Sequence, residues 1–399
     1  MTTHNTKNRR GWQNSAFLSI GLRPLFFMAA LWAALAMGLW VAMLSGSIVL
    51  PTRFDPVSWH VHEFLFGYLG AVIAGFLLTA VPNWTGRKPL IGAKLAALSA
   101  LWVLGRLAIL FSAVLPLWMV PIADGAFLVL LWCVVLREIV AGQNWRNTPV
   151  LALIGVLILA NIVFHLEADI RGTAAQGIGL RLGISAALIL IAIIGGRIIP
   201  SFTRNWLIKR GATKLPTPPM QRIDKVTLLV TGPALLAWTF VPDAFLTGVA
   251  LILMAVMNVW RLSRWQSLHT VSEPLVWVLH IAYFFIPLGA LTTAVAIFHP
   301  QIMTQAAAIH VWTTGAIGLM TVGVMTRATL GHTGRSLHAG TATTIFYLAL
   351  VLSVFTRLCA DLAPTERAHL LNASASLWIA CFVGVAVVYG PLLLRHQQA

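Results

Sequence analysis

The sequence has 399 residues, of which 59% are hydrophobic and only 10% are charged, and its formal net charge is +16 at pH 7. Soluble domains carry about 25% charged residues, so this composition excludes a protein with a fully water-facing surface. A lipid bilayer is the partner that such a chain requires. A basic excess in a soluble protein would suggest nucleic-acid binding. The distribution of the charges along this chain excludes that function, as described below.

Apolar stretches recur along the whole chain, and most reach the ~20 residues that span a bilayer. They predict an all-α polytopic membrane protein whose residues 1–399 form a single transmembrane domain. Residues 1–23 are expected to form a tail, and residues 198–225 a linker between the sixth and seventh spans. The first apolar stretch is too long for a signal peptide. The twelve expected spans are 24–45, 58–82, 91–111, 114–136, 149–165, 176–197, 226–242, 244–261, 274–298, 303–325, 340–357 and 368–393.

The basic residues are distributed unevenly between the two sides of the expected bundle. With the N-terminus inside, 21 of the 27 Lys and Arg residues fall on the inner side. Only Arg53, Arg171, Arg357 and Arg367 fall outside, and Arg106 and Arg181 lie within spans. This is a strong positive-inside pattern. It predicts a multi-pass protein of the bacterial inner membrane with both termini in the cytoplasm.

A regularity suggests three pseudo-repeated units of four helices. Pro24, Pro149 and Pro274 begin spans 1, 5 and 9 at equal intervals along the chain. Proline is well tolerated in the first turn of a helix, because the N–H that it lacks has no partner there. The alternative is that helix ends simply attract such residues.

The run 59–64, Trp-His-Val-His-Glu-Phe, opens the second span from the outer side. His60 and Glu63 are three residues apart and therefore share a helical face, whereas His62 points roughly 200° away. The two imidazoles of an ideal helix cannot both bind the same ion. Glu63 fits a partner of His60 that fixes the tautomer of a metal-binding imidazole. The alternative is a pair of interfacial histidines that cap a helix end.

Further histidines lie at membrane depth in later spans. His280 is within the ninth span, and His310 is within the tenth, roughly 10 Å deep at the rise of an α-helix. Neutral imidazoles from several spans suit haem iron or copper. Arg106 and Arg181 are candidates to pair with haem propionates, although Asp124 could instead neutralise one of them. His165, by contrast, is expected at the outer end of the fifth span.

Basic and glycine residues gather at the inner ends of spans. This inner basic rim is a candidate site for an anion or a lipid headgroup, or it serves only to orient the chain. The sequence lacks the CxxCH, GxGxxG and GxxxxGK[ST] patterns, so covalent haem, a dinucleotide site and a P-loop are not indicated. The rim consists of Arg87, Arg197, Arg204, Arg327, His332 and Arg335.

Several segments from the first span to the tenth carry a resemblance to a known family. They are 21–27, 59–63, 75–86, 196–205, 279–283, 310 and 325–335. These segments resemble the NnrS family, membrane proteins that contain haem and copper and are associated with nitric oxide metabolism and resistance to nitrosative stress.

The resemblance implies a non-covalent, b-type haem and copper, with nitric oxide as the small-molecule ligand. We expect the ligands among His60, His62, His280 and His310, with Glu63 beside them. A weaker architectural similarity is to the catalytic subunit of haem–copper oxidases, in which the second and tenth helices hold a haem; by that likeness His62 or His60 would pair with His310.

Two other functions remain open on the sequence alone. Twelve spans with a central linker are also a layout of secondary transporters, although transporter repeats come in twos. A membrane sensor or assembly factor that carries metal without catalysis is equally compatible with the residues. Whether the protein turns over a substrate stays undecided at this level.

Overall fold

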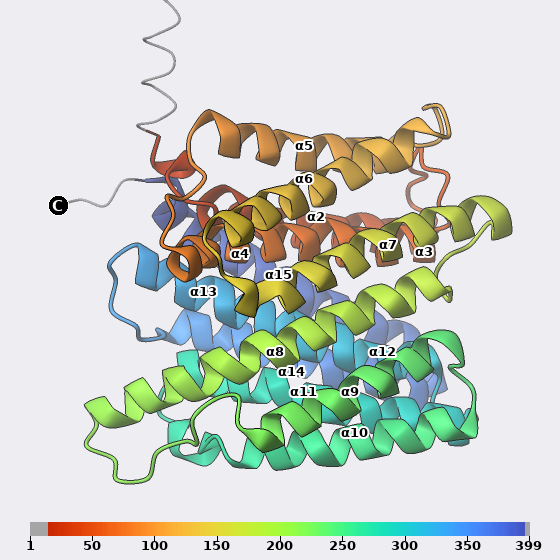
Figure 1. Ribbon diagram of the computed structural model, residues 1–399. Coiled ribbons are helices and arrows are strands. Elements are labelled where there is room, and N and C mark those ends of the chain that lie inside the picture. Colours follow the sequence, from red (N-terminus) through yellow and green to blue (C-terminus); the bar gives the residue numbers. More distant parts are fainter. Residues whose placement is uncertain (1–14, 396–399) are drawn as a thin grey trace, which may run out of the picture. The chain divides into compact units, whose positions relative to one another are not determined.

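The computed structural model describes residues 15–395 and consists of helices, with no strand in that range (Figure 1). Twelve of its helical segments are long and apolar enough to cross a membrane, as the sequence predicts. They are α2 (Leu22–Leu44); α3, η2 and α4 (Pro56–His62, Glu63–Tyr68 and Leu69–Thr85); α5 (Ala93–Leu110); α6 (Met119–Ala141); η3 and α7 (Trp145–Asn147 and Thr148–Arg171); α8 (Ile178–Lys209); α9 (Arg222–Phe240); α10 (Phe245–Ser263); α11 (Pro274–Phe298); α12, η5 and α13 (Gln305–His310, Val311–Leu319 and Met320–His332); α14 (Thr341–Leu362); and η6 and α15 (Pro364–Glu366 and Arg367–Leu394).

Several helices extend beyond the apolar stretch that predicts them. Residues 198–209 of the expected linker are helical, because α8 continues to Lys209. Helix α7 continues past residue 165 to Arg171, where Gly172 ends it with a left-handed φ of 72°. A helix needs apolar side chains only at membrane depth, since its hydrogen bonds are made by the backbone. Hydropathy therefore finds the spans but underestimates their length.

Local sequence explains how the second span begins. Asp55 caps α3 by accepting hydrogen bonds from the N–H groups of Val57 and Ser58, both at 3.0 Å. Pro56 occupies the first turn, where its missing N–H has no partner to lose. The cap fixes the start of the helix that carries His60 and His62.

The second and tenth spans share an unusual irregularity. In each, a short α-helix ends in a histidine, His62 or His310, and is followed by a π-helical segment, Glu63–Tyr68 or Val311–Leu319. π-Helical turns are rare and frequently occur at functional sites. Two of the three spans that the sequence singles out for their histidines are therefore also irregular in backbone, whereas the ninth, with His280, is a continuous α-helix.

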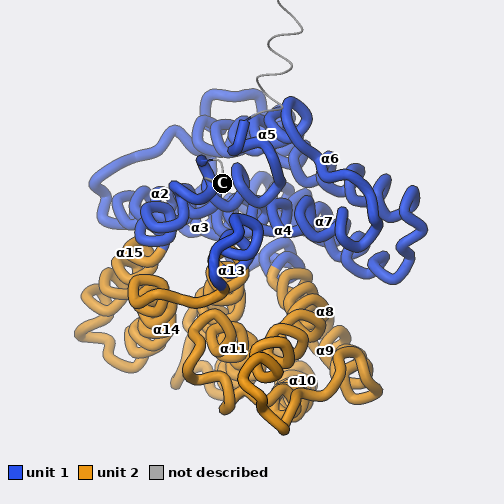
Figure 2. The backbone as a smooth tube through the Cα atoms, turned by 90° about the vertical axis from the view of Figure 1, so that its left-hand side faces the viewer, with its two compact units in different colours: residues 1–183, 327–336, 382–399 blue, residues 184–326, 337–381 orange. Residues whose placement is uncertain are grey.

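The chain packs as two compact units, coloured separately in Figure 2. Unit 1 contains residues 1–183, 327–336 and 382–399, and unit 2 contains residues 184–326 and 337–381. In unit 1, α4 packs against α2 and α6, and α6 packs against α5 and α7. In unit 2, α10 packs against α9 and α11, and η5 packs against α11 and α14.

Apolar side chains also cover much of the surface of the spans. Leu35, Leu104 and Ile122 of unit 1 and Leu229 of unit 2 are examples of large, exposed apolar residues. Such side chains are favourable only against lipid. Lys7, Arg9 and Arg10, which contribute to the expected orientation, lie outside the described residues.

Unit 2 encloses a polar network in its core. Arg261 is fully buried and its Nε donates to Asp224 Oδ1 at 2.8 Å. Its Nη1 donates to the Tyr283 hydroxyl at 3.0 Å, and that hydroxyl donates to Asn258 Oδ1 at 2.7 Å. The sequence places Arg261 among the inner surface charges. It is instead a core residue whose charge is neutralised by Asp224.

Candidate metal centre

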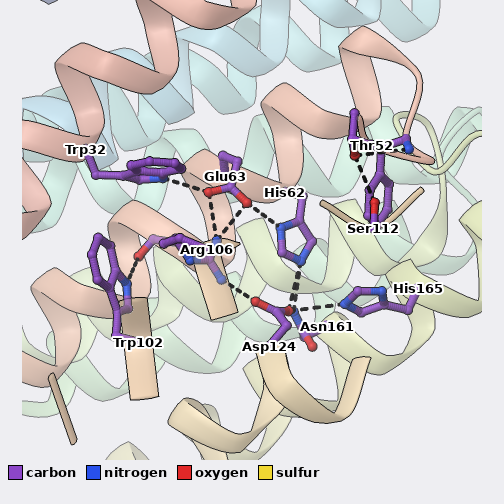
Figure 3. A network of polar contacts seen from close by, with 12 residues as sticks. Trp32, Thr52, His62, Glu63, Trp102, Arg106, Ser112, Asp124, Asn161 and His165 are labelled. Carbon is purple, nitrogen blue, oxygen red and sulfur yellow. Dashed lines mark hydrogen bonds and ion pairs between the residues drawn. The ribbon is translucent and has the colours of Figure 1, made fainter. Parts of the chain in front are cut away.

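A cluster of polar side chains lies in the core of unit 1, at the meeting of four spans (Figure 3). His62 ends α3, and Asp124 lies one and a half turns into α6. Asn161 and His165 lie on α7, four residues apart and therefore on the same helical face. All four side chains are buried. Each span contributes polar groups that would be costly to bury singly.

Three of these residues present ligand atoms to a common point. His62 Nε2 lies 3.0 Å from Asp124 Oδ2, and His165 Nε2 lies 3.1 Å from the same oxygen. One atom from each residue lies within 4.8 Å of the other two, and no second group of this kind occurs in residues 15–395. Asn161 Nδ2 donates to Asp124 Oδ2 at 2.7 Å. Two imidazoles and a carboxylate are a donor set that transition metals accept.

The ring of His62 is held from its other side. Its Nδ1 lies 3.2 Å from Glu63 Oε1, while Trp32 Nε1 donates to Glu63 Oε2 at 2.7 Å. Each ring nitrogen of His62 therefore faces a carboxylate oxygen, Nδ1 that of Glu63 and Nε2 that of Asp124. A metal ion at the common point would replace any proton on Nε2, and Glu63 would then hold the proton on Nδ1.

Arg106 of α5 joins the two carboxylates. Its Nη1 donates to both oxygens of Glu63 at 2.8 Å, and its Nη2 donates to Asp124 Oδ1. Two carboxylates against one guanidinium leave a single negative charge when both histidines are neutral. An unbalanced charge is expensive in a buried site. The cluster therefore favours one further cation, which can be a proton on an imidazole or a metal ion.

Two glycines make this close packing possible. A Cβ at Gly67 would lie 2.4 Å from Arg106 Nη1, and a Cβ at Gly105 would lie 3.2 Å from Asp124 Cα. The side chain of Trp102 also contacts this segment, since its Nε1 donates to the Gly67 carbonyl oxygen at 2.9 Å. Any larger residue at position 67 would displace the guanidinium.

Comparison with known proteins identifies the chain at this point. The family model described as "NnrS protein" matches residues 16–397. The chain belongs to the NnrS family. This membership fits a role related to nitric oxide. No curated protein and no solved structure matches the sequence.

The four histidines predicted from the sequence of this NnrS protein have different surroundings. His62 alone belongs to the buried group with Asp124 and His165. His60 stacks on Trp40 with ring centroids 4.0 Å apart. His62 lies in unit 1, whereas His280 and His310 lie in unit 2.

Within unit 2, the two histidines make separate contacts. His280 Nε2 lies 2.8 Å from Thr203 Oγ1, while its buried Nδ1 has no hydrogen-bond partner. His310 Nδ1 lies 2.6 Å from the Ala306 carbonyl oxygen, four residues earlier in the same helix.

Two sequence expectations about the NnrS site need correction. Glu63, expected beside His60, lies 3.2 Å from Nδ1 of the adjacent His62, although the backbone up to Glu63 keeps its α-helical hydrogen bonds. His165 is a buried member of the cluster and does not close its span, since α7 continues to Arg171. The sequence does place His165 four residues after Asn161, so that both polar side chains share one face of the helix.

The two arginines that the sequence offers as partners of haem propionates have different surroundings. Arg106 is bonded to Glu63 and Asp124, as the alternative interpretation of Asp124 predicts. Arg181 Nη1 donates to the Gln176 carbonyl oxygen at 2.6 Å. Neither observation shows a haem propionate site.

The inner basic rim is divided between the two units. Arg87 pairs with Glu138 of α6, and Arg204 is exposed on α8. Arg197 and Arg327 are half-buried, whereas His332, at the end of α13, and Arg335, just after it, are exposed. Unit 1 contains Arg87, Arg327, His332 and Arg335, and unit 2 contains Arg197 and Arg204.

Proposed function

We propose that this NnrS protein acts in nitric oxide metabolism or resistance to nitrosative stress through a copper ion held by His62, Asp124 and His165. The observation that carries this proposal is the convergence of three buried ligand atoms from three different spans. Polar groups at membrane depth are rare and mark functional sites. The family relationship supplies the connection with nitric oxide.

The donor set fits a single redox-active ion. Imidazole is a good ligand for copper and iron, and a bound copper ion would supply a position that can bind nitric oxide or exchange one electron with it. The residues of the chain have distinct tasks. With copper on Nε2, Glu63 would hold the proton of His62 on Nδ1, while Arg106 orients both carboxylates and Asn161 donates to Asp124.

Haem does not fit at the same point. Phe54, Phe66 and Phe164 surround the ring of His62 with centroids 5.3 to 5.6 Å away, which leaves room for an ion but not for a macrocycle. A macrocycle would need an open face beside Nε2. We keep the expected haem as a separate proposal for His280, whose buried Nδ1 has no hydrogen-bond partner.

The same proposal places the protein in the bacterial inner membrane, with both termini in the cytoplasm. The twelve spans give an even number of crossings, which returns the chain to the side on which it began. The excess of Lys and Arg on that side supports a cytoplasmic assignment.

Metal analysis of purified protein tests this function. The wild-type protein is expected to retain one copper per chain, and nitric oxide should change its absorption spectrum. His165→Ala and Asp124→Asn should lower the copper content at least tenfold, because each removes a ligand. His60→Ala is the matched control, since His60 lies on α3 beside His62 but stacks on Trp40.

Equal copper content in the His165→Ala, Asp124→Asn and wild-type proteins would refute this centre. A reduced-minus-oxidised spectrum of the same samples reports haem independently. Loss of a haem signal in His280→Ala, with unchanged copper, would support two separate sites.

A further inference from the structure

A cavity of about 30 Å³ lies in unit 1 next to the metal centre. His165 forms part of its wall and is also one of the three residues of the candidate metal centre. A cavity needs about 10–15 Å³ to hold one water molecule. This cavity therefore has room for a water molecule or for a diatomic molecule of similar size.

The wall of the cavity changes from exposed to buried toward the centre. Arg53 and Asp169 are exposed, whereas Phe54, Val120 and His165 are buried. Arginine and aspartate at the exposed side allow water to reach it. The apolar Phe54 and Val120 on the buried side disfavour ions, which lose their hydration there.

Phe54 lines the cavity and also lies beside two histidines of the centre. Its ring centroid is 5.5 Å from that of His62 and 5.7 Å from that of His165. The segment before α3 is tied to the loop after α5, which keeps this ring in place. Ser112 Oγ accepts the Arg53 backbone N–H at 2.9 Å and lies 3.0 Å from Thr52 Oγ1 (Figure 3).

We propose that this cavity is the access site through which a small neutral molecule reaches the His62–Asp124–His165 centre, and that Phe54 sets the size limit. Three observations converge on it: a cavity of molecular size, His165 of the candidate metal centre in its wall, and an aromatic ring that lines it and lies beside His62 and His165. The identification of the molecule as nitric oxide rests on the proposed function. The access itself does not.

Thiol labelling tests the access without any metal. In protein whose Cys133, Cys359 and Cys381 have been replaced, Val120→Cys should react with the small neutral reagent methyl methanethiosulfonate at least tenfold faster than Ala108→Cys. Val120 and Ala108 are both buried and lie in terminal turns on either side of the loop joining α5 and α6, but only Val120 lines the cavity.

A bulky maleimide measures the size limit in the same samples. It should label Val120→Cys at least tenfold more slowly than the small reagent, and adding Phe54→Ala should reduce this difference. Equal rates at the two cysteines, or no effect of Phe54→Ala on the maleimide, would overturn the proposal.

A second variant connects the cavity with the centre. Val120→Trp fills the space, so nitric oxide should associate with copper-loaded protein at least tenfold more slowly while the copper content stays unchanged. An unchanged association rate at full copper content would overturn the access route. A wild-type protein that binds no copper would instead count against the proposed function. The labelling rates alone would then test the access proposal.

Discussion

At the scale of single residues, the buried cluster is stabilised because its acidic and basic side chains neutralise one another. Glu63 and Asp124 share the guanidinium of Arg106, and His62 is held between the two carboxylates. The sequence identifies these four side chains as polar groups at membrane depth. It does not identify His165, because the apparent end of its apolar stretch coincides with this residue. Only the observed length of α7 places His165 inside the span.

Gly67 leaves no room for a side chain beside the cluster. In Gly67→Ala, the added methyl group would lie 2.4 Å from Arg106 Nη1, and overpacking of this kind costs about 1–3 kcal/mol. We expect a lower melting temperature in detergent and reduced copper retention, measured on the same purified sample.

Gly38→Ala provides the comparison for this prediction. Gly38 is in the middle of α2, and a Cβ there meets nothing within 4 Å. Alanine is favoured over glycine in a helix by about 0.5–1 kcal/mol, so this variant should be at least as stable as the wild type. A Gly67→Ala protein that behaves like Gly38→Ala would contradict the packing described for Arg106.

At the scale of elements, the π-helical segment Glu63–Tyr68 determines which side chains face the centre. A π-helix has more residues per turn than an α-helix, so it changes the angular relation between the residues before and after it. The sequence predicts the span and both histidines but assumes regular α-helical spacing. That assumption holds up to Glu63 and fails for the residues after it.

Deletion of Phe64 tests the importance of this irregularity. A π-helical segment accommodates about one extra residue, so removing one should restore regular α-helix without rotating α3 relative to α4. His62 would stay beside Asp124, and copper content should remain unchanged. Deletion of Ala74, in the regular helix α4, is the comparison, because it should rotate α3 by about 100° relative to the rest of α4 and lower copper content at least tenfold. An equal loss of copper in the two variants would argue against this role of the π-helix.

At the scale of the whole molecule, twelve spans follow from hydropathy alone, and the structure confirms them. The regular prolines of the sequence also lie where helix geometry prefers them. Pro24, Pro149 and Pro274 each occupy the first turn of a helix, α2, α7 and α11 respectively. The packing of the chain into two compact units could not be inferred from that repeat.

Reporter fusions test the expected orientation of the chain. Alkaline phosphatase inserted after Ser47, between the first two spans, should be active, because it folds only outside the cytoplasm. Green fluorescent protein inserted after Thr213, between the sixth and seventh spans, should fluoresce, because that loop is expected in the cytoplasm. The opposite pattern at both positions would invert the proposed orientation.

The sequence by itself determined that the chain spans a membrane and where its spans lie. These properties depend on composition and on local periodicity, and both can be observed within a single segment. The tertiary structure alone decided that His62, Asp124 and His165 meet, although 62 and 41 positions separate the successive members of this group. That meeting results from the packing of α6 against α4 and α7, which no single segment of the sequence encodes.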